Sequence, residues 1–270
     1  MENVVKCPFC NSSNKIVIAK QSHIDKYLSL IDKNLNLAER FWYKCNDCDF
    51  IYRSPRITEK EAKILYSKYR SYDFRKITPD EYFDKLTNLP DEQSETFQKA
   101  KYLKSFLNNV KINSIIDVGC GGGIFLYQLN RSFPKAYLLG LEPNIEYANM
   151  VRKRLSIDVI EDFYKEDIVK RDFDLTVSTD VIEHIHNLKI FWQVANKNIK
   201  EDKYLFIEIP SDENFSNLDI FHDVFESPHL YFFNKKHIKA LSKNYEFKVV
   251  SMKKVKNRDV IKEWYILKRV

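Results

Sequence analysis

The chain has 270 residues, 44% of them hydrophobic and 14% aromatic, which is sufficient for one full α/β domain and a smaller module. Its formal net charge is +6, but 44 Lys and Arg residues are spread among 38 Asp and Glu residues, without the basic block typical of a dedicated nucleic-acid binder. No apolar run approaches membrane-spanning length and the N-terminus lacks the apolar region of a signal peptide, so we expect a cytoplasmic protein.

Two Cys-x-x-Cys pairs lie near the start of the chain, Cys7 with Cys10 and Cys45 with Cys48. Two such pairs separated by a few tens of residues are typical of a structural zinc site with four thiolate ligands. Four thiolates leave no coordination position for a water, so this zinc would stabilise the fold and take no part in catalysis. Disulfide bonds are the competing interpretation, and a reducing cytoplasm argues against them.

A residue that tolerates left-handed backbone follows each pair, Asn11 or Asp49, where such knuckles usually have glycine. Between the pairs, residues 16–18 predict a strand. Ser22 is expected to cap a short amphipathic helix with an apolar face of Ile24, Tyr27, Leu28 and Ile31. We therefore assign residues 1–57 to a zinc ribbon with a helical insertion.

Residues 58–112 are predicted to form a helical connector and lid. Within them, a helix over 93–110 should lie against a sheet through an apolar face of Phe97, Ala100, Leu103 and Leu107. Tyrosines at 66, 69 and 72 have a spacing that fits helix packing and substrate contact equally well.

Four of the five glycines lie within residues 119–123, directly after an apolar strand at 114–118. A glycine cluster at this position indicates a backbone that approaches a ligand closely and adopts conformations that a Cβ forbids. The pattern Asp-x-Gly-x-Gly-x-Gly begins at Asp117. Ile124 stands where the last glycine of a dinucleotide fingerprint would be, which argues against NAD.

A second apolar run, 137–141, ends in Glu142, nineteen residues past Gly123. A carboxylate at the tip of the neighbouring strand can accept two hydrogen bonds from a ribose diol.

Strands and helices alternate through the rest of the chain. Strands are predicted at 114–118, 137–141, 157–160, 173–178 and 203–209, and helices at 123–132, 144–155 and 187–199. Such alternation predicts a parallel sheet with helices on both faces. Two final strands, 247–252 and 264–267, have no helix between them and should form an antiparallel pair.

These features together resemble class I S-adenosylmethionine-dependent methyltransferases. The resemblance rests on the glycine loop, on Glu142, and on the later segments 173–178, 181–185 and 204–210, in the family's order. It implies a seven-stranded, mostly parallel Rossmann-like sheet with helices on both faces over 113–270, beside the zinc ribbon. It also implies that the loop wraps the methionine part of S-adenosylmethionine and that Glu142 holds the ribose.

Asp162 follows the third strand and could accept a hydrogen bond from the adenine amino group, with Glu161 and Asp167 as nearby alternatives. Cys120, within the loop, is expected to be a small buried filler. The candidate cofactor-binding residues are Asp117, Gly119, Cys120, Gly121, Gly123, Glu142, Asp162 and Thr179.

The join between the two modules resembles a subgroup of these methyltransferases that carries an N-terminal zinc ribbon. The matching segments are 48–58 and 65–74. The subgroup is similar to enzymes that modify sugars and cell-surface polysaccharide precursors, including C-methyltransferases of deoxysugars.

A hydroxyl or carbon acceptor needs a general base. His229 falls on the position of a histidine that precedes an x-x-x-Phe pattern in sugar C-methyltransferases, although this chain has Ser227-Pro228 where that family more often has His-Glu. His222 is the second candidate, and a structural role in the 211–233 insertion stays open for both. Glu183, in a Glu-His pair shared with many relatives, is a third candidate, and we favour a role in orienting the loop beneath the cofactor.

We therefore predict an enzyme that methylates a small molecule, a sugar, sugar nucleotide or polysaccharide precursor. An RNA or protein methyltransferase that grips its polymer with the zinc ribbon is the alternative. The fifth strand ends Ile207-Glu208-Ile209-Pro210, without the Asn/Asp-Pro-Pro-Tyr/Phe motif of many amino-group methyltransferases. A catalytically inactive partner subunit is a third interpretation, against which the intact loop argues. A nucleic-acid partner is not expected, and the oligomeric state and the methylated atom stay open.

Overall fold

The computed structural model describes residues 1–69 and 72–270. Arg70, Ser71 and the side chains of Tyr72 and Asp73, which belong to the join between the modules, lie outside the described residues.

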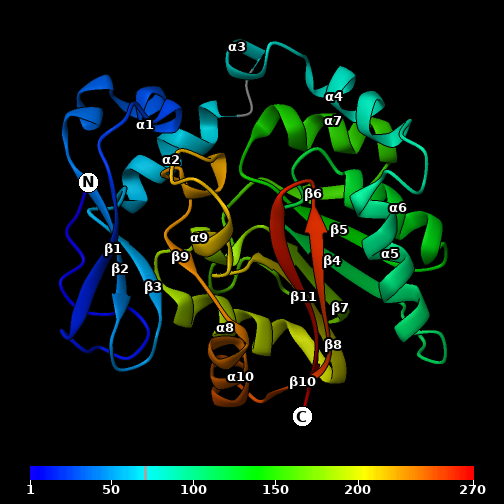
Figure 1. The fold of residues 1–270 in the computed structure, drawn as a ribbon. Helices are drawn as coiled ribbons and strands as arrows, with labels where there is room; N and C mark the ends of the chain where they lie inside the picture. The colour runs from blue at the N-terminus through cyan, green and yellow to red at the C-terminus, as the bar shows by residue number, and fades with distance from the viewer. Residues whose placement is uncertain (70–71) are drawn as a thin grey trace.

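A seven-stranded sheet forms the centre of the larger part of the molecule (Figure 1). Its strand order is β10-β11-β8-β7-β4-β5-β6, and β11 alone runs antiparallel to its neighbours. The strands are β4 (Ser114–Val118), β5 (Tyr137–Leu141), β6 (Asp158–Ile160), β7 (Phe173–Thr179), β8 (Ile199–Pro210), β10 (Phe247–Asn257) and β11 (Val260–Arg269). The predicted α/β class, with its mostly parallel sheet, is confirmed.

Helices cover both faces of this sheet. One face packs against α8 (Leu188–Asn198) and α10 (Lys235–Asn244), and the other against α5 (Glu95–Phe106), α6 (Ile124–Ser132) and α7 (Ile145–Leu155). Side chains alternate between the faces, so that in β8 Ile207 lies in the first core and Phe206 in the second. The helix and strand positions agree with the sequence predictions, but the C-terminal hairpin extends further than predicted.

The parallel strands carry their C-terminal ends to one edge of the sheet, where β4, β5, β7 and β8 finish at Val118, Leu141, Thr179 and Pro210. Ligands of open α/β sheets bind beyond this edge.

A second, antiparallel sheet lies beside the first and has the order β1-β2-β3-β9 (Figure 1). Three strands come from the N-terminal module and the fourth from far along the chain. They are β1 (Lys15–Gln21), β2 (Arg40–Cys45), β3 (Ile51–Ser54) and β9 (Tyr231–Phe232). The two parts of the molecule therefore share the segment around β9.

The helical insertion of the N-terminal module consists of α1 (Lys26–Ile31) and the 3₁₀ turn η1 (Lys33–Leu37). Asp25 caps α1, accepting hydrogen bonds from the Tyr27 and Leu28 amides. The predicted cap at Ser22 is wrong, because the helix starts three residues later and a buried carboxylate satisfies its first amides.

The connector contains α2 (Glu59–Lys68), α3 (Tyr72–Arg75) and α4 (Pro79–Thr87) before α5. Capping boxes, Thr58 with Glu61 and Thr78 with Glu81, fix the starts of α2 and α4. The loop after β7 contains the 3₁₀ turn η2 (Ile182–His184). The insertion between β8 and β9 contains the short helix α9 (Asn214–Asn217) and the 3₁₀ turn η3 (Asp223–Phe225). No helix in residues 1–69 or 72–270 has the length and apolar character needed to cross a bilayer.

Candidate functional site

The loop after β4 turns through three glycines with left-handed backbone. The angle φ is +75° at Gly119, +54° at Gly121 and +71° at Gly123, a region that residues with a Cβ rarely adopt. At Gly119 an added Cβ would also lie 2.6 Å from Cγ2 of Val181. The Gly119 amide donates to the Leu141 carbonyl at 2.8 Å, which holds the loop against the end of β5.

Glu142 follows β5 directly, and its side chain is buried. Oε2 accepts a hydrogen bond from the Gly121 amide and Oε1 one from the Asn144 amide, both at 2.9 Å. Each carboxylate oxygen can accept a further hydrogen bond, and Glu142 lines a cavity.

The other residues predicted around the loop are also at this edge of the sheet. Asp117, Cys120, Gly121 and Thr179 line a second cavity next to the one that Glu142 lines, and Gly119 borders both. Gly123 lines neither of them. Sγ of Cys120 packs against Gly140, where an added Cβ would lie 2.8 Å from the sulfur, in keeping with the filler role expected of this cysteine.

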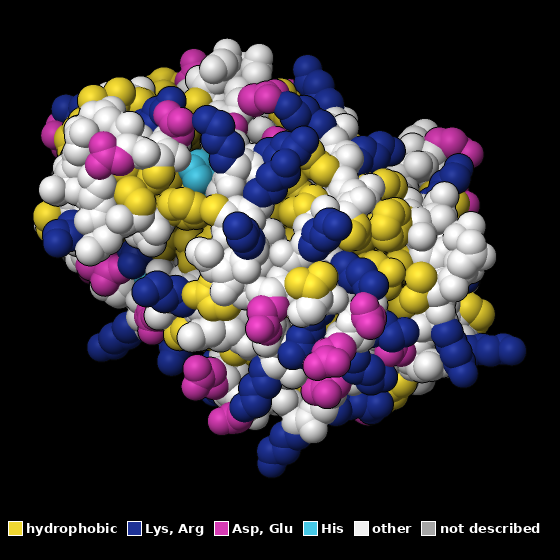
Figure 2. All heavy atoms as spheres, turned by 90° about the horizontal axis from the view of Figure 1, so that it is seen from below, with side chains coloured by type: hydrophobic (Ala, Val, Ile, Leu, Met, Phe, Trp, Pro, Cys, Tyr) yellow, Lys and Arg dark blue, Asp and Glu magenta, His cyan; other side chains and the backbone are white. Residues whose placement is uncertain are grey.

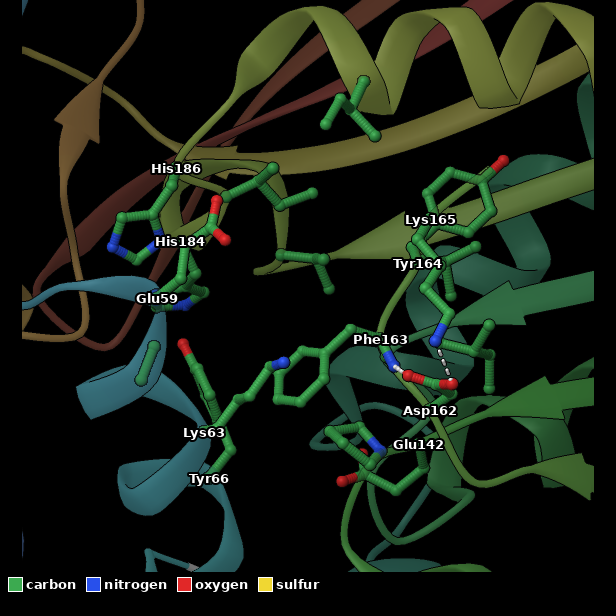
Figure 3. A pocket seen from close by; sticks show the side chains of 18 of the residues that line it. Glu59, Lys63, Tyr66, Glu142, Asp162, Phe163, Tyr164, Lys165, His184 and His186 are labelled. Carbon is green, nitrogen blue, oxygen red and sulfur yellow. Dashed lines mark hydrogen bonds and ion pairs between the residues drawn. The ribbon is translucent and has the colours of Figure 1, made fainter. Parts of the chain in front are cut away.

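Asp162 lies across the cavity from α2 (Figure 3). Burial acts to raise the pKa of its carboxyl, but hydrogen bonds from Lys165 and the Phe163 amide outweigh this effect and lower the pKa. Asp162 is therefore ionised and paired with Lys165 at neutral pH.

Two cavities meet at this edge of the sheet. The inner cavity, of about 320 Å³, is bounded by Glu142, Asp162 and side chains of α2, and Figure 3 shows Lys63 and Tyr66 of α2 facing Phe163. The outer cavity, of about 660 Å³, extends to the 222–229 segment and the β10–β11 turn. They share five lining residues, Tyr66, Tyr69, Gly119, Asp180 and His184.

His229 borders the outer cavity beside His184, with ring centroids 4.7 Å apart. Its Nδ1 hydrogen-bonds the Val224 carbonyl, so Nδ1 carries the proton and Nε2 is the basic nitrogen. Burial lowers the pKa of His229 to about 4, which keeps the ring neutral at pH 7.

Glu183 lies fully buried behind these two rings. One carboxylate oxygen of Glu183 and one ring nitrogen each of His184 and His229 lie within 4.8 Å of one another. Burial and the nearby Asp180 raise the pKa of Glu183 well above its usual value. His184 donates from Nδ1 to the Pro228 carbonyl at 2.6 Å, and the sequence had not indicated this residue as a candidate in its own right.

His222 lines the outer cavity, and its two ring nitrogens contact neighbouring residues of the protein. Its Nδ1 accepts the Val224 amide at 3.1 Å, capping η3, and its Nε2 lies 3.3 Å from Asp259 on the β10–β11 turn.

A buried ionic network, which sequence reasoning missed, borders the outer cavity. Lys99 on α5 donates to Glu208 on β8 at 2.6 Å, and Lys262 on β11 lies 2.7 Å from Asp180 and 3.2 Å from Glu208. Burial acts to lower the pKa of Lys99, but the attraction of Glu208 outweighs this effect and raises it. The available signal was Glu208 within the apolar second half of β8, residues 204–210.

The four cysteines of the N-terminal module converge, as predicted from their spacing. The Sγ atoms of Cys7 and Cys48 are 3.7 Å apart and those of Cys10 and Cys45 are 3.6 Å apart. These distances exceed a disulfide bond of about 2.05 Å and fit the edges, about 3.8 Å, of a tetrahedron with Zn–S bonds of about 2.3 Å.

The turns after these cysteine pairs also have the expected conformation. Asn11 and Asp49 each have a φ of 63°, a left-handed conformation that Asn and Asp tolerate in place of glycine.

Comparison with known protein families identifies one domain. A family model described as a methyltransferase domain matches residues 74–252, more than half of the chain. Among curated proteins, the mitochondrial ubiquinone biosynthesis O-methyltransferase of Bos taurus is 35% identical over 103 residues, which are 34% of this chain and 27% of that protein. The alignments span 27–42% of the length of the first curated relatives.

Solved structures share the fold. A S-adenosylmethionine-dependent methyltransferase from Clostridium acetobutylicum ATCC 824 has a TM-score of 0.53 and 16% identity over 70% of this chain and 97% of its own. Magnesium protoporphyrin IX methyltransferase from Synechocystis PCC 6803, with bound SAH, has a TM-score of 0.57 and 12% identity over 77% of this chain and 98% of its own.

Proposed function

The chain belongs to the methyltransferase domain family, and on this premise we propose that it transfers the methyl group of S-adenosylmethionine to a small-molecule acceptor. The observation that carries the proposal is that the inner and outer cavities meet at Gly119, Asp180 and His184. A cofactor held in the inner cavity would thus present its reactive end to a second molecule in the outer one.

The residues of the glycine loop and the inner cavity fit this cofactor. The loop would hold the amino acid part, because its left-handed backbone at Gly119 and Gly121 permits close approach. The buried carboxylate of Glu142 would accept hydrogen bonds from the ribose hydroxyls. Asp162 would accept one from the adenine amino group. Asp117, Cys120 and Thr179 line the adjoining outer cavity and would border the cofactor where the two cavities meet. Gly123 lines neither cavity and would act by shaping the loop against α7. The cofactor, when bound, supplies an activated methyl group.

The outer cavity would hold the acceptor in line with that methyl group. The tyrosine rings and charged side chains that line it suit a ligand with apolar C–H faces and hydroxyl groups. We propose a sugar, sugar nucleotide or polysaccharide precursor, which the resemblance of the join between the modules also supports.

His229 would accept the proton that a hydroxyl or carbon acceptor loses. Its Nδ1 proton is committed to the Val224 carbonyl, so Nε2 is the nitrogen that receives the acceptor's proton. Glu183, buried behind the ring, would orient the segment and influence the charge of His229, and His222 would contribute less.

We propose that the four-cysteine cluster holds one structural zinc ion in a closed site. The module around it, residues 1–57, would support the rest of the enzyme, residues 58–112 would act as connector and lid, and 113–270 would bind the cofactor. Figure 2 shows Lys and Arg interspersed with Asp and Glu on the side of the molecule away from the cavities. Along the whole chain, 44 Lys and Arg residues are likewise spread among 38 Asp and Glu residues, which favours a small acceptor over an anionic polymer.

The test is a methyl-transfer assay with radiolabelled S-adenosylmethionine and a panel of sugar nucleotides, a quinol and total RNA. We expect label in a sugar nucleotide. Label in the quinol or in RNA would disprove the proposed acceptor class but leave methyl transfer standing, whereas failure to bind S-adenosylmethionine in calorimetry would disprove both.

A further inference from the structure

The segment that carries His229 is attached to the N-terminal module as well as to the large sheet. Tyr231 and Phe232, directly after it, form β9 and pair with Tyr52 and Ile51 of β3. The Arg53 amide also donates to the Leu230 carbonyl at 3.0 Å. The position of the His229 segment thus depends on a strand about 180 residues earlier in the chain.

Arg53 makes the most extensive contacts from that module. Its side chain is 1% exposed. Nη1 donates to Oγ of Ser227 at 2.7 Å, and Nη2 donates to the Phe225 carbonyl and, at 2.9 Å, to Oε1 of Gln21. The guanidinium thereby joins two points of the chain that lie two and four residues before His229.

Two further side chains of the module hold the same segment. Oδ2 of Asp25 accepts the Ser227 amide at 2.7 Å and lies 3.8 Å from Nη1 of Arg53. Nε2 of Gln21 donates to the Phe225 carbonyl at 3.1 Å. Asp25 offsets the charge of the buried guanidinium, as a buried charge requires. Both Nη atoms have acceptors, whereas Nε has no hydrogen-bond partner in the part of the chain that the structure describes.

The large sheet holds the other side of the segment. The Leu230 amide donates to the Glu183 carbonyl at 2.9 Å, and His184 holds the Pro228 carbonyl. His229 therefore lies between two supports, and its ring position is defined when both are present.

We propose that Arg53 is a positioning residue that holds the 225–229 segment so that Nδ1 of His229 stays bonded to Val224 and Nε2 faces the outer cavity. The N-terminal module would then complete the acceptor site, in addition to being stabilised by zinc. This inference rests on the proposed function for its catalytic meaning, but the placement of His229 can be tested independently of any acceptor.

The tautomer of His229 reports this placement. The Nδ1-H form is required by the bond to the Val224 carbonyl, whereas free histidine favours the Nε2-H form. The charged or titratable groups that face the ring are Glu183, His184, Arg53 and Lys262. The positive charge of Arg53 disfavours protonation of the ring.

The experiment measures the histidine ring nitrogens of the full, zinc-containing chain by long-range ¹H–¹⁵N NMR, with S-adenosylhomocysteine at saturation and His229 assigned from a His229→Gln variant. We expect an Nδ1-H ring in the unmodified protein. In Arg53→Met, the ring should lose its pure Nδ1-H signature and its pKa should rise. In Arg53→Lys, which keeps the charge, the signature should be lost with a smaller rise of the pKa.

Lys20→Met is the control, since it also removes a positive charge from the N-terminal module, but Lys20 pairs with Glu39 on the surface of that module. It should leave the His229 signals unchanged. Should Arg53→Met fail to fold, Ser227→Ala removes one partner of the same guanidinium and should shift the tautomer in the same direction. Wild-type tautomer and pKa in Arg53→Met, or in both Arg53→Lys and Ser227→Ala, would overturn the inference.

With an acceptor identified, kcat should fall about 10–100-fold in Arg53→Lys while the affinity for S-adenosylmethionine stays unchanged. A normal turnover of His229→Gln would refute the proposed base but leave the positioning by Arg53, read from the NMR signals, intact.

Discussion

Two main-chain amides hold the carboxylate of Glu142 at the end of β5. The bonds from Gly121 and Asn144 link the glycine loop to the start of α7 through this single side chain. Glu142 both shapes the loop and lines the inner cavity, so we expect its removal to weaken ligand binding in two ways.

Glu142→Ala and Gly121→Val should each weaken binding of S-adenosylmethionine by at least ~1–3 kcal/mol, the first by leaving polar groups unpaired and the second by straining a left-handed turn. Isothermal calorimetry measures the effect. Glu146→Ala, on an exposed position of α7, is the control and should bind normally. Wild-type affinity in both test variants would contradict the assignment of the inner cavity.

His229→Ala should lower the rate of methyl transfer by ~10²–10⁴ without changing cofactor affinity, and His222→Ala should have a smaller effect. Since burial lowers the pKa of His229 to about 4, the neutral base predominates above that pH. In the unmodified enzyme, kcat should therefore stay flat from neutral pH to about pH 5 and fall through about pH 4. Normal turnover of both variants would assign the histidines a structural role.

Residues whose role depends on neighbours in the chain were predictable from the sequence. The glycines and Glu142 follow apolar runs directly, so the strand ends that place them can be read from the pattern. The pairing of Lys99 with Glu208 was not predictable, because the two residues are 109 positions apart in the sequence. The sequence shows two charged residues within apolar patterns but not that they face each other.

At the scale of elements, the ionic network joins α5 to β8 and β11 across one face of the large sheet. Lys99→Met would leave Glu208 buried with Lys262 and Trp264 as its remaining partners. We expect a loss of about 3 kcal/mol in the free energy of unfolding, measured with urea. Lys101→Met, on the exposed side of the same helix, should change it by less than about 0.5 kcal/mol. Equal stability of the two variants would show that the network contributes nothing to the fold.

The N-terminal sheet has a small core and should depend on its metal. The purified protein should contain about one zinc per chain, and Cys45→Ser should lose it and lower the melting temperature. Cys120→Ser changes the cysteine outside the cluster and should keep the zinc. Elemental analysis that finds no zinc in protein prepared without chelator, or full zinc in Cys45→Ser, would contradict the prediction.

Element positions in the large sheet were predictable because strands and helices alternate with clear apolar periods. The cap of α1 was not, since Ser22 and Asp25 both suit a helix start and the burial of Asp25 decides between them. The strand β9 was not predictable from the sequence either. It has two residues, and its partner β3 lies about 180 positions earlier.

At the scale of the whole molecule, the connector contributes side chains to both cavities. Helix α2 supplies Lys63 and Tyr66 to the inner cavity, and α4 supplies Tyr82 to the outer one. If the cofactor binds in the inner cavity as proposed, it would have to pass these helices on entering and leaving. The connector is thus the part of the molecule whose opening would control exchange.

We therefore expect S-adenosylhomocysteine to slow the backbone hydrogen exchange of α2 and α4. The ligand would add contacts to helices that otherwise rest on the cavity rims, and so raise the free energy of their local opening. Mass spectrometry of peptic peptides measures the exchange rate of each helix separately. Helix α10, which packs on the sheet away from both cavities, serves as the internal control and should exchange at an unchanged rate. Protection confined to the glycine loop and the end of β5, with α2 and α4 exchanging as in the unliganded protein, would rule out the lid and leave residues 58–112 as a fixed connector.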